Sequence, residues 1–380
     1  MTARTMSSDL AWMQQALALA RRGEGHTRPN PPVGAVLVKN GRRIGQGWHR
    51  RAGGPHAEIY AMRQAGDQAR GATLYVTLEP CSTHGRTPPC VDAILQAGIR
   101  RVVVAAIDPN PSHAGRGIRL LRRHGVDVVT GIGAEEAARL IAPFACLMRN
   151  RRPWFTLKLG LSLDGRIADH THSSRWITGP EARKIVQSMR RVSDAILIGA
   201  GTLRHDNPSL WPRPDRGRSP WRVIVVRTGA LPLSAQVFTD AHASRTIVAA
   251  PQGWAPATTR ALRRKGITVW ELPARRFLPA LATQLGELGV LRVLCEGGGI
   301  LAGELIRARL ADELCVFLAP MLLGGPVGAM GNTQWRLAQA PRFHLVESLP
   351  AGHDIFLRLE PAGPAGRAEP SRPGKPRKTQ

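Results

Sequence analysis

A histidine and a glutamate lie two residues apart, directly after a Gly-Gly-Pro turn, in the stretch GGPHAEIYAMRQAG. His56 stands where a helix is expected to begin, because residues 57–65 are mostly good helix formers and glycine and proline precede them. By itself the pair is most simply a solvated first helical turn, in which Glu58 interacts favourably with the helix dipole. A chemical role therefore needs partner residues elsewhere in the chain.

Two cysteines supply partners for a metal site. The segment TLEPCSTHGRTPPCVDAILQAG places Cys81 after a predicted strand and Cys90 at the first position of a predicted helix. One imidazole and two thiolates leave a fourth coordination position for water, which is the pattern of a catalytic zinc site. A helix N-terminus stabilises a thiolate, so helix starts at His56 and Cys90 suit one metal. We expect one Zn²⁺ per chain, bound by His56, Cys81 and Cys90.

Glu58 is then the expected proton shuttle. Zinc lowers the pKa of a bound water to roughly 7, and a carboxylate two residues after a ligating histidine can reach that water without ligating the metal. His-x-Glu followed by Pro-Cys is the signature of zinc nucleobase deaminases, in which this glutamate is general acid and base. Here an eight-residue insert, STHGRTPP, replaces the usual Cys-x-x-Cys spacing and indicates a different substrate from a plain nucleoside or tRNA base. The alternative is a structural zinc knuckle or two unrelated cysteines.

The surrounding elements alternate between strands and helices, which predicts an α/β layer fold. A polar junction, RNRRPW, separates a first domain over 1–150 from a second over 151–360, and the Pro- and Gly-rich residues 361–380 predict a disordered tail. After an amphipathic N-terminal helix, the first domain has expected strands at 33–38, 72–78, 101–107 and 126–129, with helices at 56–68, 90–97, 116–124 and 134–148. The second has expected strands at 154–162, 194–201, 221–226, 245–250, 267–272, 292–299, 312–320 and 353–360, with helices at 180–190, 256–265, 279–288 and 300–309.

Composition narrows the classes of function. The 380 residues carry 53 Lys and Arg against 27 Asp and Glu, a formal charge of +26. The excess is mostly Arg spread along the chain, so phosphorylated substrates explain it as well as a nucleic acid does. No apolar run approaches the ~20 residues of a membrane span. An odd number of cysteines, five, suggests metal ligands rather than disulfides, and we expect a cytoplasmic protein without a membrane partner.

A second group of motifs suggests a nucleotide cofactor. The segments LKLGLSLDGRIA, ILIGAGTLRHDNPSL and VLCEGGGILAGELI each end a predicted strand in a polar or glycine-rich turn. In the last, backbone N–H groups at the start of a helix could bind the phosphates of a dinucleotide. The same glycines are often only a turn. They also lack the G-x-G-x-x-G spacing, so a Rossmann domain is not indicated.

The motifs TRPNPPVGAVLV, GGPHAE and LEPCSTHGRTPPC resemble those of the bifunctional riboflavin-biosynthesis deaminase–reductase family, in which the insert between the cysteines is typical. The resemblance covers residues 8–360. It implies a cytidine-deaminase-like zinc domain followed by a dihydrofolate-reductase-like domain that uses NADPH. The family's zinc ligands fall on His56, Cys81 and Cys90, and its proton shuttle falls on Glu58. Motif loops that could hold the pyrimidine and ribose phosphate contain Asn30, His84 and Arg86, although Asn30 is equally a turn residue.

The same resemblance assigns residues in the second domain. The positions that match NADP contacts are Gly160, Trp176, Thr202, Asp206, Gly298, Gly299, Ile300, Leu301, Ala302, Gly303 and Glu304. The positions that match substrate contacts are Ser174, Arg190, Leu210, Arg213 and Glu296. Arg190 and Arg213 suit a ribose phosphate, which a guanidinium binds bidentately, or are solvated surface charges. The apolar surroundings of the other cysteines predict inert core residues at Cys146, Cys295 and Cys315.

The expected function is therefore a two-step enzyme. The zinc domain would hydrolyse an amino group from 2,5-diamino-6-(5-phosphoribosylamino)pyrimidin-4(3H)-one. The second domain would pass a hydride from NADPH to the ribosyl chain, giving 5-amino-6-(5-phosphoribitylamino)uracil. The alternatives are a tRNA adenosine deaminase with an accessory RNA-binding domain, which the charge favours, and a non-enzymatic zinc-stabilised binding module. We expect small phosphorylated pyrimidines as partners, no specific nucleic acid, and a homo-oligomer.

Overall fold

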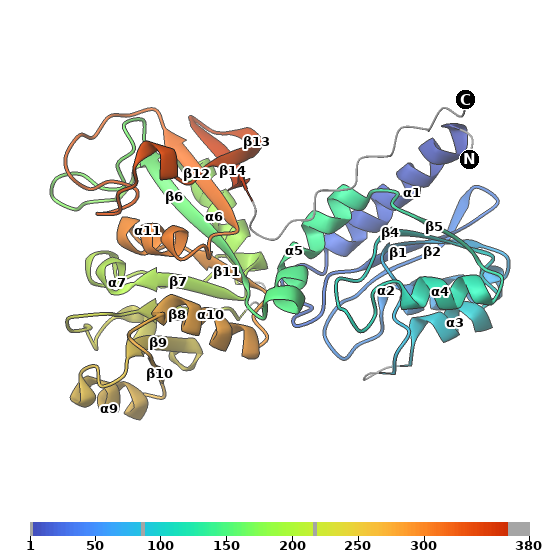
Figure 1. Cartoon of the computed structure of the whole chain (residues 1–380), viewed down its shortest axis with the longest axis horizontal. Coiled ribbons are helices and arrows are strands. Elements are labelled where there is room, and N and C mark those ends of the chain that lie inside the picture. Colours follow the sequence, from blue (N-terminus) through green and yellow to red (C-terminus); the bar gives the residue numbers. More distant parts are fainter. Residues whose placement is uncertain (1–2, 85–87, 216–218, 364–380) are drawn as a thin grey trace. The chain divides into compact units, whose positions relative to one another are not determined.

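The structure is a computed structural model that describes residues 3–84, 88–215 and 219–363 (Figure 1). It contains a five-stranded and a nine-stranded sheet. Contacts divide the chain into two compact units, Met1–Trp154 with Ile185–Leu294, and Phe155–Lys184 with Cys295–Gln380. Within the described ranges, every helix is too short or too polar to cross a membrane. The tail predicted for 361–380 falls almost entirely on residues outside the described ones.

The five-stranded sheet has the order β2-β1-β3-β4-β5. Strand β1 pairs antiparallel with β2 and β3, whereas β3, β4 and β5 run parallel. The strands are β1 (Gly34–Lys39), β2 (Arg42–Trp48), β3 (Thr73–Leu78), β4 (Arg101–Ala106) and β5 (Asp127–Thr130). The helices are α1 (Ala3–Arg21), α2 (Ala57–Ala65), α3 (Cys90–Gln96), α4 (Arg116–Arg123) and α5 (Ala134–Asn150).

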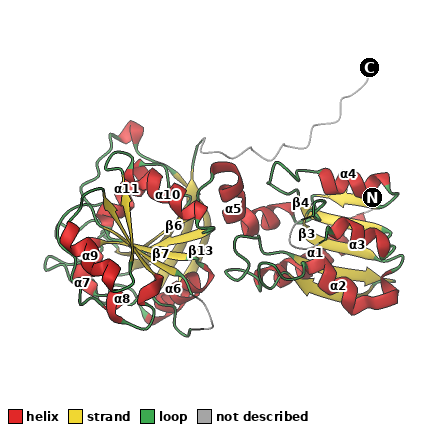
Figure 2. Cartoon of the chain, turned by 90° about the horizontal axis from the view of Figure 1, so that it is seen from below, coloured by secondary structure: helices red, strands yellow, loops and turns green. Residues whose placement is uncertain are grey.

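Alternate residues of these strands face two separate cores. Leu37, Leu74 and Val102 pack with α2, α3 and α4, and the residues that follow Leu74 and Val102 pack with α1 and α5. Strands buried on both faces explain the continuous apolar runs of the sequence. Helices α2, α3 and α4 lie side by side along one face (Figure 2). Helices α2 and α3 are neighbours in this layer, and they begin next to His56 and at Cys90, respectively.

The sequence analysis did not predict strand β2. Its residues, RRIGQGW, lack the β-branched and aromatic enrichment that marks a strand. The structure gives its glycines a packing role. A Cβ at Gly45 would lie 2.1 Å from the Ala61 carbonyl oxygen, and one at Gly47 would lie 2.4 Å from that of Ala57. Helix α2 therefore rests directly on the backbone of β2, which fixes the helix that begins after His56.

The nine-stranded sheet has the order β10-β9-β8-β7-β11-β6-β12-β14-β13. Strands β7 to β10 run parallel, as do β6 and β12, and β14 pairs antiparallel with β12 and β13. Its strands are β6 (Trp154–Ser162), β7 (Ala195–Gly199), β8 (Trp221–Val225), β9 (Thr246–Pro251), β10 (Thr268–Leu272), β11 (Arg292–Cys295), β12 (Glu313–Ala319), β13 (Phe343–Ala351) and β14 (Asp354–Pro361). The helices are α6 (Pro180–Val192), α7 (Ala200–Asp206), α8 (Gln236–Thr239), α9 (Pro256–Arg264), α10 (Phe277–Glu287) and α11 (Gly299–Arg307).

Three expectations in this part of the chain need correction. The strand predicted over 194–201 ends at Gly199, and its last residues begin α7 instead. The strand predicted over 292–299 ends at Cys295, and Gly299 begins α11. Strand β13 is not predicted, because most of its side chains are exposed and Pro350 lies within it. Proline is tolerated in an edge strand, where no neighbour needs its missing N–H. The three cysteines expected in the core are buried, at Cys146, Cys295 and Cys315.

Candidate active site

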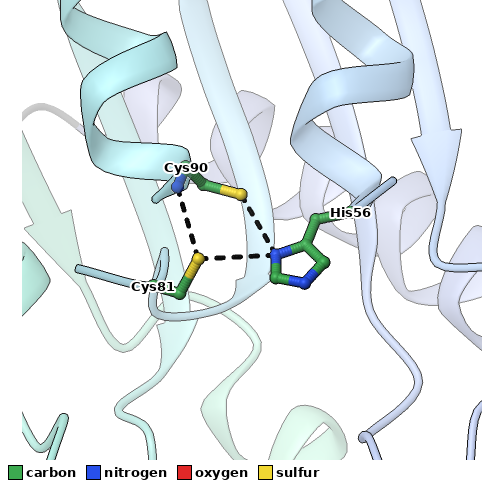
Figure 3. Close-up of side chains that lie close together, drawn as sticks. All are labelled: His56, Cys81 and Cys90. Atoms are coloured by element: carbon green, nitrogen blue, oxygen red, sulfur yellow. Dashed lines mark hydrogen bonds between the residues drawn. The ribbon is translucent and has the colours of Figure 1, made fainter. Parts of the chain in front are cut away.

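Three elements bring the expected metal ligands together in the first unit (Figure 3). His56 is the N-cap of α2, Cys90 is the first residue of α3, and Cys81 lies in the loop after β3. The His56 Nδ1 atom lies 3.2 Å from Sγ of Cys90 and 3.4 Å from Sγ of Cys81. All three donor atoms lie within 4.8 Å of one another. The arrangement offers one nitrogen and two sulfur donors to a single ion.

The two thiols differ in their electrostatics. A hydrogen bond from the Cys90 thiol, aided by His56 and by the Cys90 backbone N–H at 3.3 Å, lowers the pKa of Cys81 to about 4. The hydrogen bond to Cys81 raises the pKa of His56 to about 9. The hydrogen bond that the Cys90 thiol makes to Cys81, together with burial, raises the pKa of the Cys90 thiol. Binding of a divalent cation would displace the protons of His56 and Cys90, because a metal is bound by neutral imidazole and by thiolates.

Glu58 lies in the first turn of α2 and is only 3% exposed. Burial raises the pKa of its carboxyl group. Its Oε2 atom makes no hydrogen bond to any described part of the chain, which is uncommon for a buried carboxylate oxygen. An unsatisfied oxygen next to a Cys₂His donor set fits a zinc site in which a bound molecule completes the hydrogen bonding.

His49 is a site residue that the sequence analysis missed. It is 2% exposed, and its ring lies edge-on to that of His56 with centroids 5.3 Å apart. Its Nδ1 atom lies 3.1 Å from the Pro55 carbonyl oxygen, so Nδ1 must carry the proton. Nε2 then accepts from the side-chain amide of Asn30, 3.1 Å away. His49 therefore orients the side-chain amide of Asn30 through its Nδ2 atom, and the Oδ1 atom of that amide is an acceptor for a ligand.

The loop between the cysteines is closed at its base. The Val91 N–H donates to the Cys81 carbonyl oxygen at 3.2 Å, so the two ends of the segment between the cysteines lie next to each other. His84 within it is exposed. Arg86, the other residue considered for substrate binding, lies outside the described residues. The long spacing between the cysteines is thus compatible with their convergence.

Glu79 anchors the loop that carries Cys81. It is 4% exposed, and its carboxylate accepts from four backbone N–H groups, three at the start of α4 and one just after β4. The donors are Asp108 at 3.2 Å, Gly115 at 2.8 Å, Gly117 at 2.8 Å and Ile118 at 3.4 Å. A carboxylate suits this position because the N-terminus of a helix presents unpaired N–H groups. Glu79 fixes Cys81, two residues later, to α4.

In the second unit, Glu296 follows β11 and has a side chain that is 7% exposed. Its carboxylate lies 3.9 Å from Nζ of Lys158 on β6. Lys158 was not predicted as a site residue, because a lone lysine in a strand carries no sequence signal. Trp176 is 69% exposed, and Arg183 lies over its ring at 4.4 Å. Ser174 is half-buried and Gly160 pairs with Phe317 between β6 and β12.

The run 298–304 begins α11, with Gly298 as its N-cap. Leu301, Ala302 and two of the glycines are buried, whereas Ile300 is 65% exposed and Glu304 is half-buried. A Cβ at Gly299 would lie 2.4 Å from the Gly328 carbonyl oxygen, so this glycine is needed for packing. A ligand at this helix start can therefore meet backbone N–H groups and Ile300, but not the buried side chains.

The remaining predicted residues lie in the first unit. Thr202 and Asp206 are half-buried on α7, Arg190 is half-buried near the end of α6, and Arg213 is exposed. Leu210 is 1% exposed and belongs to the core beneath β7 and β8. Its side chain cannot touch a ligand, so any contact there must use the backbone.

Two family models match the chain. The cytidine and deoxycytidylate deaminase zinc-binding region matches residues 6–106, and the RibD C-terminal domain matches residues 153–357. The first match covers strands β1 to β4, and the second covers β6 to β13 and the start of β14. The chain thus combines a cytidine-deaminase-like α/β domain with an α/β domain of the RibD reductase type.

Curated proteins and solved structures match over nearly the whole length. Riboflavin biosynthesis protein RibD of Bacillus amyloliquefaciens is 41% identical over 92% of this chain and 95% of its own length. RibD of Escherichia coli K12 is also 41% identical, over 92% and 99%. The structure of Acinetobacter baumannii RibD, form 1, gives a TM-score of 0.85 at 40% identity, covering 94% of this chain and 100% of that one. A Thermotoga maritima diaminohydroxyphosphoribosylaminopyrimidine deaminase/5-amino-6-(5-phosphoribosylamino)uracil reductase gives 0.85 at 35% identity over the same shares.

Proposed function

The chain belongs to the RibD family of bifunctional riboflavin biosynthesis deaminase–reductases, and from this we propose the substrate and the residues of each step. The deaminase half acts on 2,5-diamino-6-(5-phosphoribosylamino)pyrimidin-4(3H)-one. The reductase half then reduces the ribosyl chain with NADPH, giving 5-amino-6-(5-phosphoribitylamino)uracil. The observation that carries the proposal is the convergence of His56, Cys81 and Cys90 beside the buried Glu58. The tRNA deaminase alternative is not favoured, because residues 153–357 match a reductase domain.

In the deaminase half, His56, Cys81 and Cys90 would hold one zinc ion per chain. When bound, zinc supplies Lewis-acid activation of water. On its free carboxylate oxygen, Glu58 takes one proton from the attacking water and passes it to the ring nitrogen. It then takes the second proton from the hydroxyl group added to the ring carbon and passes it to the departing amine, which leaves as ammonia while the carbonyl forms. Asn30, oriented by His49, offers a carbonyl oxygen to an N–H of the pyrimidine.

In the reductase half, NADPH would lie against Trp176, Ile300 and the start of α11. When bound, it supplies the hydride. The other proposed cofactor and substrate positions are those assigned above by resemblance. Leu210 would contribute backbone groups only, and Arg190 and Arg213 would bind the ribose phosphate. The ammonium of Lys158 is a proton donor that lies 3.9 Å from the Glu296 carboxylate in the second unit.

The organisation of the chain forms part of the proposal. We place the deaminase domain at 1–150, the reductase domain at 151–360 and a basic tail at 361–380. The five cysteines are free thiols, as a reducing cytoplasm would keep them. The arginine excess serves small phosphorylated ligands rather than a specific nucleic acid. The protein would act as a homo-oligomer without a membrane partner.

Cys81→Ser tests the assignment. The variant should lose zinc and deamination together, because it removes a ligand, while it still oxidises NADPH with the deaminated substrate. Metal content and the two rates would be measured on one preparation, with the phosphoribosylamino-pyrimidine and a tRNA compared as deaminase substrates. Full deamination by metal-free protein would rule out the zinc role. Deamination of the tRNA alone would reject the proposed substrate.

A further inference from the structure

A fully buried arginine lies beneath the loop that carries two of the proposed reductase residues. Arg222 on β8 has a side chain that is 0% exposed, and all five of its N–H donors are engaged. Two of them bind the Asp240 carboxylate, at 2.6 and 2.9 Å. The others reach Oγ1 of Thr246 at 3.1 Å, the Val237 carbonyl at 2.9 Å and the Ser209 carbonyl at 3.1 Å. The arginine thus ties strand β8 to the segment that follows α7.

Asp240 extends this tie to a second point. It accepts from the His242 backbone N–H at 3.0 Å. The His242 ring stacks on Trp211, with centroids 3.6 Å apart and planes 3° apart. Trp211 is only 7% exposed and directly follows Leu210. The Arg222–Asp240 pair therefore holds the loop by one backbone carbonyl and, through His242, by one aromatic ring.

The loop held in this way carries the exposed side chain of Arg213. Leu210 has a φ of +59°, a left-handed conformation in which the Cβ of an L-residue is crowded, and its side chain is buried. Arg213 is exposed, its backbone N–H donates to Oε1 of Gln187 at 2.7 Å, and its Nη2 donates to Oγ of Ser209 at 3.3 Å. Among the described residues, Ser209 accepts from this guanidinium, whose other N–H donors can face a phosphate.

We propose that Arg222 and Asp240 are positioning residues for the reductase substrate, which hold the loop 207–215 so that Arg213 meets the phosphate of the ribosyl chain. The inference rests on the reductase function proposed above. Burial of an ion pair is a poor route to stability, because apolar residues of similar volume often serve as well or better. A planar group with five fixed donors is instead suited to orienting several backbone groups at once. The pair touches no substrate itself and acts through Ser209, Trp211 and Arg213.

The test compares Asp240→Asn and His242→Ala with wild type on two substrates, the deaminated phosphoribosylamino-pyrimidine and the same compound without its phosphate. Each variant should raise KM for the phosphorylated substrate by roughly three- to tenfold, because residues that share one hydrogen-bond network have coupling energies that correspond to changes of about this size. KM for the dephosphorylated substrate and for NADPH should stay unchanged. Arg213→Ala should cost about ten- to a hundredfold in kcat/KM on the phosphorylated substrate alone.

Controls separate positioning from folding. Glu271→Gln breaks an exposed ion pair with Arg263 in the same unit and should leave phosphate selectivity unchanged. Asp240→Asn combined with Arg213→Ala should be no worse than Arg213→Ala alone. An additive double variant, or an equal loss on both substrates, would overturn the positioning role. If Asp240→Asn does not fold, judged by its thermal unfolding and by its loss of NADPH binding, His242→Ala decides. A wild type without reductase activity would instead reject the proposed function.

Discussion

At the scale of single residues, Glu58→Gln isolates proton transfer from metal binding. The amide has nearly the shape of the carboxylate, so zinc content should be retained. Deamination should fall by about 10²–10⁴-fold or more, because a general acid–base group contributes that much and Glu58 serves in several steps. Zinc analysis and product formation would be measured together, with NADPH oxidation as the internal control. Retention of more than about a tenth of the deaminase rate would assign the shuttle to another group.

Residue types and spacing were enough to predict which side chains would meet at the proposed metal centre. His56, Cys81 and Cys90 converge because each stands at a helix start or strand end that the pattern located. His49 and Lys158 could not be found in this way. Their importance comes from contacts to Asn30 and Glu296, and no local pattern in the sequence marks such contacts.

At the scale of elements, Glu79→Gln should loosen the junction between the Cys81 loop and α4. The amide loses one acceptor oxygen and directs its own N–H₂ group at backbone donors. We expect a loss of about 1–3 kcal/mol in the free energy of unfolding. Zinc affinity should fall by roughly 10–100-fold, as for other groups that support a ligand. Chelator competition measures the second effect. Asp92→Asn, an exposed carboxylate in the first turn of α3, should change neither quantity.

Helix α11 gives a second prediction at this scale. A Cβ at Gly303 would lie 2.2 Å from Oγ1 of Thr333 and 2.7 Å from the Met330 carbonyl oxygen. Gly303→Ala should therefore cost about 1–3 kcal/mol in stability through overpacking, and should weaken NADPH binding by displacing the helix start. Thermal unfolding and an NADPH titration would measure the two effects.

Gly201→Ala is the matched control. Gly201 lies on α7 with no atom within 4 Å of a built Cβ, so alanine should instead stabilise the protein by about 0.5–1 kcal/mol. Equal responses of the two glycine variants would contradict the packing argument.

Elements were predictable where local sequence and burial agree. Strand β6 was expected over the residues where it occurs, because its apolar run is buried on both faces. Strands β2 and β13 escaped prediction for opposite reasons. The first owes its place to glycines that accept α2, and the second is an exposed edge with weak patterning. In both cases a neighbour in the fold, not the segment itself, decides the conformation.

At the scale of the whole molecule, a buried ion pair links α1 to the first sheet. Asp9 is 1% exposed and accepts from Arg101 at 2.8 and 2.9 Å and from the Tyr75 hydroxyl at 2.7 Å. Burial favours the neutral acid, but these donors outweigh it and lower the pKa of Asp9 below its ordinary value. Its contribution to stability is therefore complete above about pH 4 and is lost as the pH falls through the folded-state pKa.

Asp9→Asn should thus destabilise the protein at neutral pH by on the order of 3 kcal/mol, since it leaves Arg101 without its buried partner. The difference from wild type should begin to narrow below about pH 4, where Asp9 becomes protonated in the unfolded chain, and should disappear as the pH falls through the lower folded-state pKa. Urea midpoints followed by deaminase activity at several pH values would show this. Asp127→Asn removes a partner of Arg101 whose side chain is 65% exposed, and should cost less than about 1 kcal/mol. A constant difference between Asp9→Asn and wild type across the acid range would contradict the linkage.

The strand order of the larger sheet has a consequence for how the protein is made. All strands of the smaller sheet lie within residues 34–130, so that sheet can close soon after it leaves the ribosome. Strand β6 is different, because its neighbours β11 and β12 begin at Arg292 and Glu313. At about 5–20 residues per second, the roughly 130 intervening residues take about 7–26 s to synthesise. During that interval the apolar strand WFTLKLGLS has neither of its hydrogen-bonding neighbours. The nascent chain must therefore be kept from pairing through this strand with other nascent copies of the protein.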